Sequence, residues 1–440
     1  MYGVVHVSRR NLEEQVPYAG EGIAETIRSL AAPLQGARVL NLSLSPFGTG
    51  VAELLHSLVP LFRDLGIQSE WQVAQSDTEF ARTVRLMYQG LCGRGIGWTP
   101  EIVDSWQDYS RFGATFFDGS YDVVVVHDPQ LAGILEVLSE RGLSSRGGRW
   151  VWHCHLDLRR AQPEVWETLL SALRQYDAWI SQDAEFVPAA PEPVLSAVIP
   201  PAIDPTNAVN MEMLPNSIRQ FCGNLGIDPQ RPLVVQVGPL DPSFDPVGAI
   251  DVYRQAKVEW PDLQLLLANP LAENSLEAWS RFEQVARHVD GDPHIRVLAT
   301  QSDAGRLTIN AAQRAASVVI QRSVPAGFAL SVWEAQWKGK PVVAGWSGAL
   351  PSQIVDGQTG RLAADDDGFV QAILALIADP VAAGKLGAAG RDVVRKDHLI
   401  TRLLAQELHV LNRLLGSPSP GRANSPASGL EPASRYPGSP

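Results

Sequence analysis

The chain has 440 residues, of which 45% are hydrophobic and 19% charged, a composition typical of a folded protein large enough for two domains. Its formal net charge of −12 argues against a nucleic-acid-binding surface, because such surfaces are basic. Three distant cysteines (Cys92, Cys154 and Cys222) argue against a disulfide framework and for a reducing compartment. We see no signal peptide and no apolar run long enough to span a bilayer, so we expect a cytoplasmic protein without a membrane partner.

The first half of the chain alternates short apolar segments with amphipathic stretches, which is the pattern of parallel β-strands joined by helices. Residues 37–43 form the first expected strand, followed by a glycine-containing loop and a helix over residues 51–65. Further strands are expected at residues 121–127, 150–155, 178–181 and 196–200. Polar and glycine residues gather just after these strands, where open α/β sheets bind their ligands.

The second half opens a new set of strands after a polar stretch at residues 207–228. These strands are expected at residues 232–237, 263–268, 295–298, 317–320 and 341–344. The division indicates an N-terminal domain over residues 1–215 and a C-terminal domain over residues 216–390. Residues 391–415 are expected to form a helix that crosses back to the first domain. Residues 416–440 are rich in Ser, Pro and Gly and are expected to be a disordered tail.

A motif in the C-terminal third points most directly to a function. Residues 324–334 read Val-Pro-Ala-Gly-Phe-Ala-Leu-Ser-Val-Trp-Glu. The segment resembles the signature of retaining nucleotide-sugar glycosyltransferases, in which two glutamates flank a Gly-Phe-Gly turn. Glu334 stands at the second glutamate, whereas Ala326 replaces the first.

Several further stretches, in order along the chain, extend the resemblance to the trehalose synthases, which join a nucleotide-activated glucose to free glucose. The stretches are residues 45–60, 126–130, 152–157, 200–205, 327–330 and 398–402. The resemblance runs from residue 18 to residue 415 and implies the GT-B fold, an α/β architecture of two facing Rossmann-like domains with an interdomain cleft. It also implies a nucleotide-glucose as co-substrate rather than a bound cofactor, and glucose or trehalose as the other ligand. It allows a homodimer, and the sequence demands no metal.

In the first domain, the resemblance places Gly48 and Gly50 near the donor diphosphate and the acceptor. Glycines before a helix let the backbone approach a ligand, and the first N–H groups of the helix bind anions. The alternative is a tight turn without a ligand. His155 and Asp157 are expected beside the reacting sugar as catalytic residues, although a histidine after a strand is often structural.

Polar residues after a neighbouring strand form a candidate acceptor site. His127, Asp128 and Gln130 are expected to hydrogen-bond the acceptor hydroxyls, because carboxylates and amides offer their oxygen and nitrogen atoms in pairs. The alternative is that Asp128, which precedes a proline, caps the next helix.

In the second domain, the resemblance assigns the donor site to Gly327, Phe328, Leu330 and Glu334. Glu334 would bind the ribose hydroxyls of the nucleotide. The alternative for this residue is an ordinary carboxylate on the surface of a helix.

The donor site lacks charges that the resemblance leads us to expect. The family has an arginine and a lysine after the first strand of the second domain, where this chain has Pro239 and Phe244. Those cations hold the diphosphate and stabilise the negative charge that develops as it leaves, which neither proline nor phenylalanine can do. Pro325 and Ala329 likewise replace an arginine and a glycine beside the motif.

Two functions stay open at this point. One is a retaining glycosyltransferase with weak or lost activity, in which Arg322 swings toward a phosphate as a substitute cation. Lys338 and Lys340 are expected instead to be solvated at the end of a helix. The other is a non-catalytic pseudo-glycosyltransferase that binds sugar or regulates a partner, since the substitutions cluster on the donor side.

Overall fold

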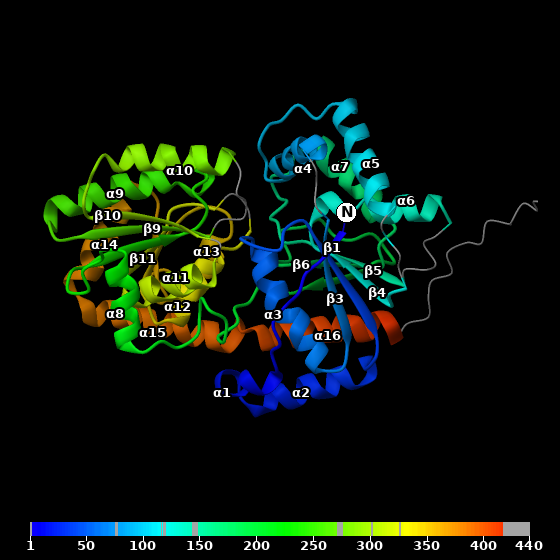
Figure 1. The fold of residues 1–440 in the computed structure, drawn as a ribbon, viewed down its shortest axis with the longest axis horizontal. Coiled ribbons are helices and arrows are strands. Elements are labelled where there is room, and N and C mark those ends of the chain that lie inside the picture. The colour runs from blue at the N-terminus through cyan, green and yellow to red at the C-terminus, as the bar shows by residue number, and fades with distance from the viewer. Residues whose placement is uncertain are drawn as a thin grey trace, which may run out of the picture.

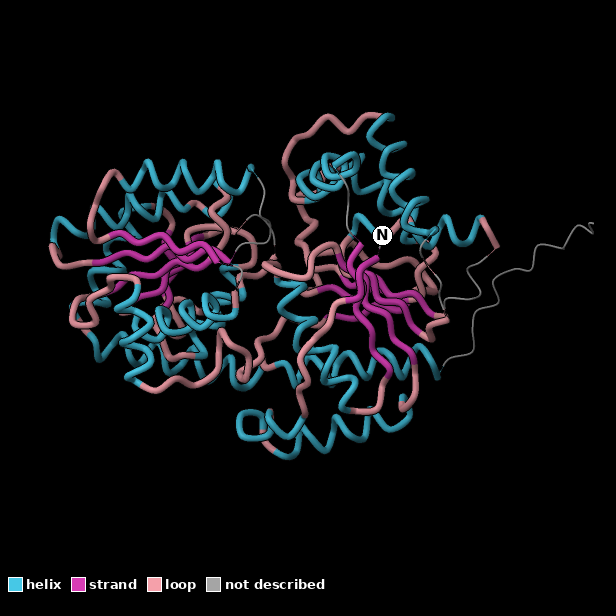
Figure 2. The backbone as a smooth tube through the Cα atoms, in the orientation of Figure 1, coloured by secondary structure: helices cyan, strands magenta, loops and turns pink. Residues whose placement is uncertain are grey.

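The computed structural model describes residues 2–74, 78–115, 117, 120–142, 148–270, 276–300, 302–324 and 327–416. Within these residues the strands form two sheets that stand side by side, each with helices on both faces (Figures 1 and 2). The two sheets confirm the expected α/β architecture of two Rossmann-like units. The expected tail lies outside the described residues from residue 417 onward.

The first lobe is built on a largely parallel sheet with the strand order β1-β3-β2-β4-β5-β6-β7, in which β1 alone pairs antiparallel. Alternate residues of the run Val123–Val126 enter different cores. Val123 and Val125 pack on one face of the sheet, and Val124 and Val126 on the other, as the period of two in a strand requires. The strands are β1 (Tyr2–Val4), β2 (Arg38–Ser43), β3 (Gln68–Ala74), β4 (Val123–Val126), β5 (Arg149–His153), β6 (Ala178–Ser181) and β7 (Leu195–Val198).

Helices of the first lobe divide between these two faces. One face carries α2 (Glu21–Ala31) and α3 (Gly50–Asp64), preceded by the short α1 (Val16–Ala19). The opposite face carries α4 (Thr78–Leu91), α5 (Pro100–Thr115), α6 (Ile134–Glu140) and α7 (Pro163–Leu173). Because β2, β4, β5 and β6 run parallel, the loops that follow them lie along the same edge of the sheet, where ligands bind in such folds.

The second lobe has an all-parallel sheet with the strand order β10-β9-β8-β11-β12-β13. Its strands are β8 (Leu233–Val237), β9 (Gln264–Pro270), β10 (Ile295–Thr300), β11 (Val318–Gln321), β12 (Val342–Gly345) and β13 (Arg361–Ala363). Its helices are α8 (Pro215–Asn224), α9 (Pro246–Glu259), α10 (Leu276–Val289), α11 (Asp303–Ala315), α12 (Leu330–Trp337), α13 (Leu350–Gln353), α14 (Asp366–Ala378) and α15 (Pro380–Asp397).

Among the described residues, no single helix is long and apolar enough to cross a membrane. The pair α14 and α15 meets that criterion by length and composition only when taken together, and the two helices are bent by 106° relative to each other.

The last helix, α16 (Ile400–Gly416), returns to the first lobe and runs beneath it (Figure 1). Leu404 and Leu408 on this helix are buried in the same core as Val39 of β2. The crossing point is a short bridge in which the Ile203 N–H donates to the His398 carbonyl and the Ile400 N–H donates to the Ile203 carbonyl. The polypeptide therefore passes between the lobes twice at neighbouring positions.

Candidate donor and acceptor site between the lobes

The loop after β2 faces the start of α12 in the other lobe. Gly48 has a φ of 70°, which favours glycine, and Thr49 caps α3 by accepting a hydrogen bond from the Ala52 N–H at 3.1 Å. A Cβ atom placed on Gly50 would lie 3.6 Å from Cδ1 of Leu330. The structure thus brings together two loops that the sequence assigned to the same donor site.

The loop before α12 approaches the histidine segment of the first lobe. Gly327 has a φ of 79°, and a Cβ atom on it would lie 3.0 Å from the carbonyl oxygen of His155. Phe328 packs against Phe186 of the first lobe and against Trp333, with ring centroids 5.4 and 5.2 Å apart. Phe328 therefore helps to join the lobes by apolar packing. Pro325 and Ala326 lie outside the described residues.

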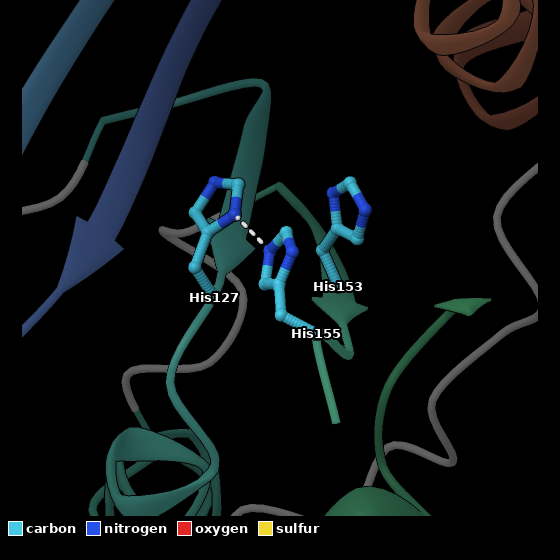
Figure 3. Close-up of side chains that lie close together, drawn as sticks. All are labelled: His127, His153 and His155. Carbon is cyan, nitrogen blue, oxygen red and sulfur yellow. Dashed lines mark hydrogen bonds between the residues drawn. The ribbon is translucent and has the colours of Figure 1, made fainter. Parts of the chain in front are cut away.

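A directed chain of hydrogen bonds holds His155 and His127 (Figure 3). The Gln182 amide nitrogen donates to His155 Nδ1 at 3.1 Å, so His155 Nε2 carries the proton that it donates to His127 Nδ1 at 3.0 Å. His127 Nε2–H then donates to Oδ1 of Asn41 at 3.1 Å. Burial lowers the pKa of both imidazoles well below 6.5, which favours their neutral forms.

The contacts of His155, a predicted catalytic residue, differ between its ring and its main chain. Both of its ring nitrogens bind protein groups, and its main-chain carbonyl oxygen faces Gly327 of the second lobe. The imidazole therefore fixes this segment within the first lobe, and the main-chain carbonyl is the part of His155 that approaches the second lobe.

His153 completes a cluster of three histidines that the sequence analysis did not anticipate. Its ring stacks on His155 with centroids 4.2 Å apart, and its Nδ1 lies 3.1 Å from Oε1 of Glu407 on α16. The spacing of two between His153 and His155 was the available signal, because it sets both residues on one side of an extended segment. Ligand nitrogens of His127, His153 and His155 lie within 4.8 Å of one another. His127 Nδ1 and His155 Nε2 hydrogen-bond each other at 3.0 Å, however, so these two nitrogens are directed at each other rather than at a common metal position.

Three further predicted residues make separate contacts. Asp128 Oδ2 accepts the Leu44 N–H at 2.7 Å, and burial raises the pKa of its carboxyl to about 6. Asp128 also stands at the N-cap position of the 3₁₀ helix Pro129–Leu131, as the alternative predicted, but its side chain makes no capping bond. Asp157 pairs with Arg159 at 2.8 Å. Gln130 is buried and donates to the Val84 carbonyl of α4, so the structure does not bring it to the histidine chain.

Glu334 is a buried carboxylate, not a surface one, with 8% of its area exposed. No described residue hydrogen-bonds to its side chain, and burial raises its pKa against the opposing charges of Lys338 and Arg306. Lys338 is also buried, which corrects the expectation that it is solvated. Its Nζ donates to Asn210, Gln313 and the Glu334 carbonyl at 2.8–3.0 Å.

Arg322, the predicted substitute cation, is paired with two carboxylates, one of which is Asp245 directly after Phe244. Its guanidinium pairs with Asp245 and Asp366 at 2.9 and 2.6 Å and lies over the ring of Phe369. Arg322 also lines a hollow of about 520 Å³ together with Trp346. Two carboxylates already neutralise its charge.

Among the described residues, two pairs of opposite charge join the lobes, and neither could be predicted from the local sequence. Arg306, in the first turn of α11, forms an ion pair with Glu53 in the first turn of α3. Arg94 of the first lobe pairs with Asp241, which follows β8, at 3.3 Å. Asp241 also pairs with Arg281 at 3.3 Å.

The sequence of this chain is similar to two protein families and to several characterised proteins. Residues 41–188 match the family model described as "Trehalose synthase, N-terminal domain", and residues 251–379 match "Glycosyl transferases group 1". The trehalose synthase of Pyrococcus horikoshii is 34% identical over 420 residues, which covers 94% of this chain and 100% of the relative. The chain belongs to the trehalose synthase family. The trehalose synthase of Rubrobacter xylanophilus is 36% identical over 394 residues, or 89% of this chain and 94% of the relative.

Solved structures confirm the GT-B fold of this trehalose synthase family member. A trehalose-phosphate synthase of Burkholderia xenovorans in complex with glucose-6-phosphate superposes with a TM-score of 0.67 at 14% identity, covering 86% of this chain and 100% of that one. The sucrose-phosphate synthase of Thermosynechococcus elongatus gives a TM-score of 0.64 at 16% identity and covers 86% and 99% of the two chains. At these identities the likeness concerns the fold.

Proposed function

We propose that this protein transfers glucose from a nucleotide-glucose donor to glucose and forms trehalose, at a rate reduced by the substitutions in its donor site. Membership of the trehalose synthase family and the convergence of four loops support the reaction class. The observation that carries the proposal is the close approach of Gly50 to Leu330 and of Gly327 to His155, which brings the predicted donor segments of both lobes beside a predicted catalytic residue.

The second lobe would bind the nucleotide. Glu334 suits the ribose, because a carboxylate accepts hydrogen bonds from two vicinal hydroxyls and this one has no partner among the described residues. The diphosphate would lie toward Gly48 and Gly50, where the first N–H groups of α3 favour an anion.

The first lobe would bind the acceptor. Asp128 has a second carboxylate oxygen besides the one that accepts the Leu44 N–H, and it can take a sugar hydroxyl. His127 and His155 would position the segment, and the His155 carbonyl would face the donor sugar. Front-side attack would proceed through an oxocarbenium-like state, with the leaving phosphate accepting the proton of the acceptor hydroxyl. Asp157 remains a predicted catalytic residue that would act beside its pair with Arg159.

Turnover would be slow because the leaving diphosphate lacks the expected cations. Phe244 packs against the core of the second lobe, and Arg322 is neutralised by two aspartates. Losing one preorganised charge-stabilising group costs about 10²–10³ in rate. The same observations favour the second candidate, a sugar-binding pseudo-glycosyltransferase that has kept its acceptor side.

Isothermal titration of the purified protein with UDP-glucose, ADP-glucose, GDP-glucose and trehalose tests the proposal. We expect one of the donors and trehalose to bind. Trehalose binding without any donor would favour the pseudo-glycosyltransferase. The absence of donor binding at millimolar concentration would contradict glucosyl transfer.

A further inference from the structure

We propose that Arg306 binds the donor phosphates in place of the missing cations, and that Glu53 occupies its guanidinium while the donor is absent. The inference rests on the proposed function, because it names the group that holds the donor of that reaction. It concerns two residues from opposite lobes, separated by 253 positions in the sequence, that meet at the candidate site.

The first argument is position. Glu53 lies in the first turn of α3, three residues after Gly50, and Gly50 lies against Leu330 at the start of α12. Since Arg306 contacts Glu53, its guanidinium stands beside the N-terminus of α3, toward which the diphosphate is expected to lie. The positive charge of Arg306 also acts on Glu334, the candidate ribose ligand.

The second argument is the state of the guanidinium. Only 18% of the Arg306 side chain is exposed, and its buried Nε has no hydrogen-bond partner among the described residues. A guanidinium offers five N–H donors in a planar fork that matches a phosphate. One carboxylate uses part of that capacity, so donors remain for an anion with more oxygens.

The third argument is the state of the other cations near the second lobe's motifs. Arg322 is neutralised by Asp245 and Asp366, and the Lys338 ammonium is enclosed by three acceptors. Arg94 also bridges the lobes, but its side chain is 45% exposed to solvent, which weakens its electrostatic effect. Arg306 combines partial burial with a single carboxylate partner.

The proposal predicts that substitutions at Arg306 and at Glu53 change the affinity for the donor in opposite directions. Exchange of the Glu53 carboxylate for a phosphate would leave Arg306 paired throughout. Removing Arg306 then weakens donor binding, whereas neutralising Glu53 removes a competitor and strengthens it. If the pair served only to hold the lobes together, both changes would weaken binding alike.

Titration calorimetry on the full chain tests whether Arg306 binds the donor phosphates and Glu53 competes with them. UDP, ADP and GDP are first screened on the wild type, and the tightest binder and its nucleoside are then titrated into Arg306→Ala, Arg306→Lys, Glu53→Gln and Arg94→Ala. We expect Arg306→Ala to lose about 10- to 100-fold in affinity for the diphosphate, with little change for the nucleoside. Arg306→Lys should retain part of the affinity, and Glu53→Gln should bind the diphosphate more tightly than the wild type. Arg94→Ala, which removes the other interlobe pair, is the matched control.

The outcomes separate the two proposals. If the wild type binds a nucleoside diphosphate and Arg306→Ala binds it equally well, the role of Arg306 is wrong while the proposed function stands. Equal losses in Arg306→Ala, Glu53→Gln and Arg94→Ala would also overturn it in favour of simple bridging. If the wild type binds none of the three, the proposed function itself fails. Circular dichroism shows that each variant is folded, and the gain expected for Glu53→Gln cannot arise from misfolding.

Discussion

Asp128 shows how burial changes the chemistry of a single residue. One of its oxygens accepts the Leu44 N–H, yet desolvation raises its pKa from 3.8 to about 6. Because the folded-state pKa lies above the unfolded-state value, the folded protein binds the proton more tightly than the unfolded chain. Stability is therefore greatest below pH 3.8 as far as this group is concerned, and it decreases as the pH rises to about 6.

Asp128→Asn should remove this penalty, since the amide oxygen still accepts the Leu44 N–H. We expect the variant to be more stable than the wild type by about 1–3 kcal/mol at a pH above 7, and the difference to vanish toward about pH 4. Urea unfolding of both proteins at several pH values between about 4 and 8 measures this difference in the free energy of unfolding. A variant that is less stable than the wild type at neutral pH would show that the ionised carboxylate is stabilised by the fold.

The two expected cations can be introduced by substitution at Pro239 and Phe244. Pro239→Arg with Phe244→Lys restores the two charges and should raise affinity for the donor and its turnover at least about tenfold. Val247→Lys adds a charge at an exposed site on the same segment and serves as the control, for which we expect no gain. Initial rates of transfer from each nucleotide-glucose measure the gain. Equal gains in the double variant and in Val247→Lys would mean that only the net charge matters, which contradicts the prediction.

At the level of elements, the sequence predicted most strands of both sheets but not β1, β3 and β13. β1 and β13 have only three residues each, and β3 carries polar residues at its alternate positions, so none presents a long apolar run. For the candidate site, the sequence predicted roles for His127 and His155 beside a ligand, and the structure brings these two residues into contact. Their bonds to Asn41 and Gln182 depend on the order of strands in the sheet, which local sequence does not reveal.

Helix α16 should be essential to the first lobe, because its apolar side belongs to that lobe's core. Leu408→Ala removes a fully buried side chain and should lower the free energy of unfolding by about 2–5 kcal/mol. Leu415→Ala, on the same helix but 38% exposed, should change it by less than about 0.5 kcal/mol. Denaturant titrations compare the two, and equal losses would contradict the packing described.

For the whole molecule, we expect the arrangement of charges between the lobes to determine how tightly a nucleotide-glucose donor binds. The polypeptide crosses twice beside Ile203 and His398, while Glu53–Arg306 and Arg94–Asp241 join the lobes by charge. A donor that enters between the lobes would meet a guanidinium already paired with a carboxylate. The molecule therefore holds a guanidinium between the lobes, beside the first turn of α3, where we propose that the donor binds.

Nuclear magnetic resonance of ¹³C-labelled glucose incubated with the protein and each nucleotide-glucose tests the central claim most directly. We predict that labelled trehalose accumulates slowly with at least one donor, and that Glu334→Ala abolishes its formation at the same donor concentration. If no labelled trehalose forms with any of the three donors, or if Glu334→Ala forms it as fast as the wild type, the account is contradicted.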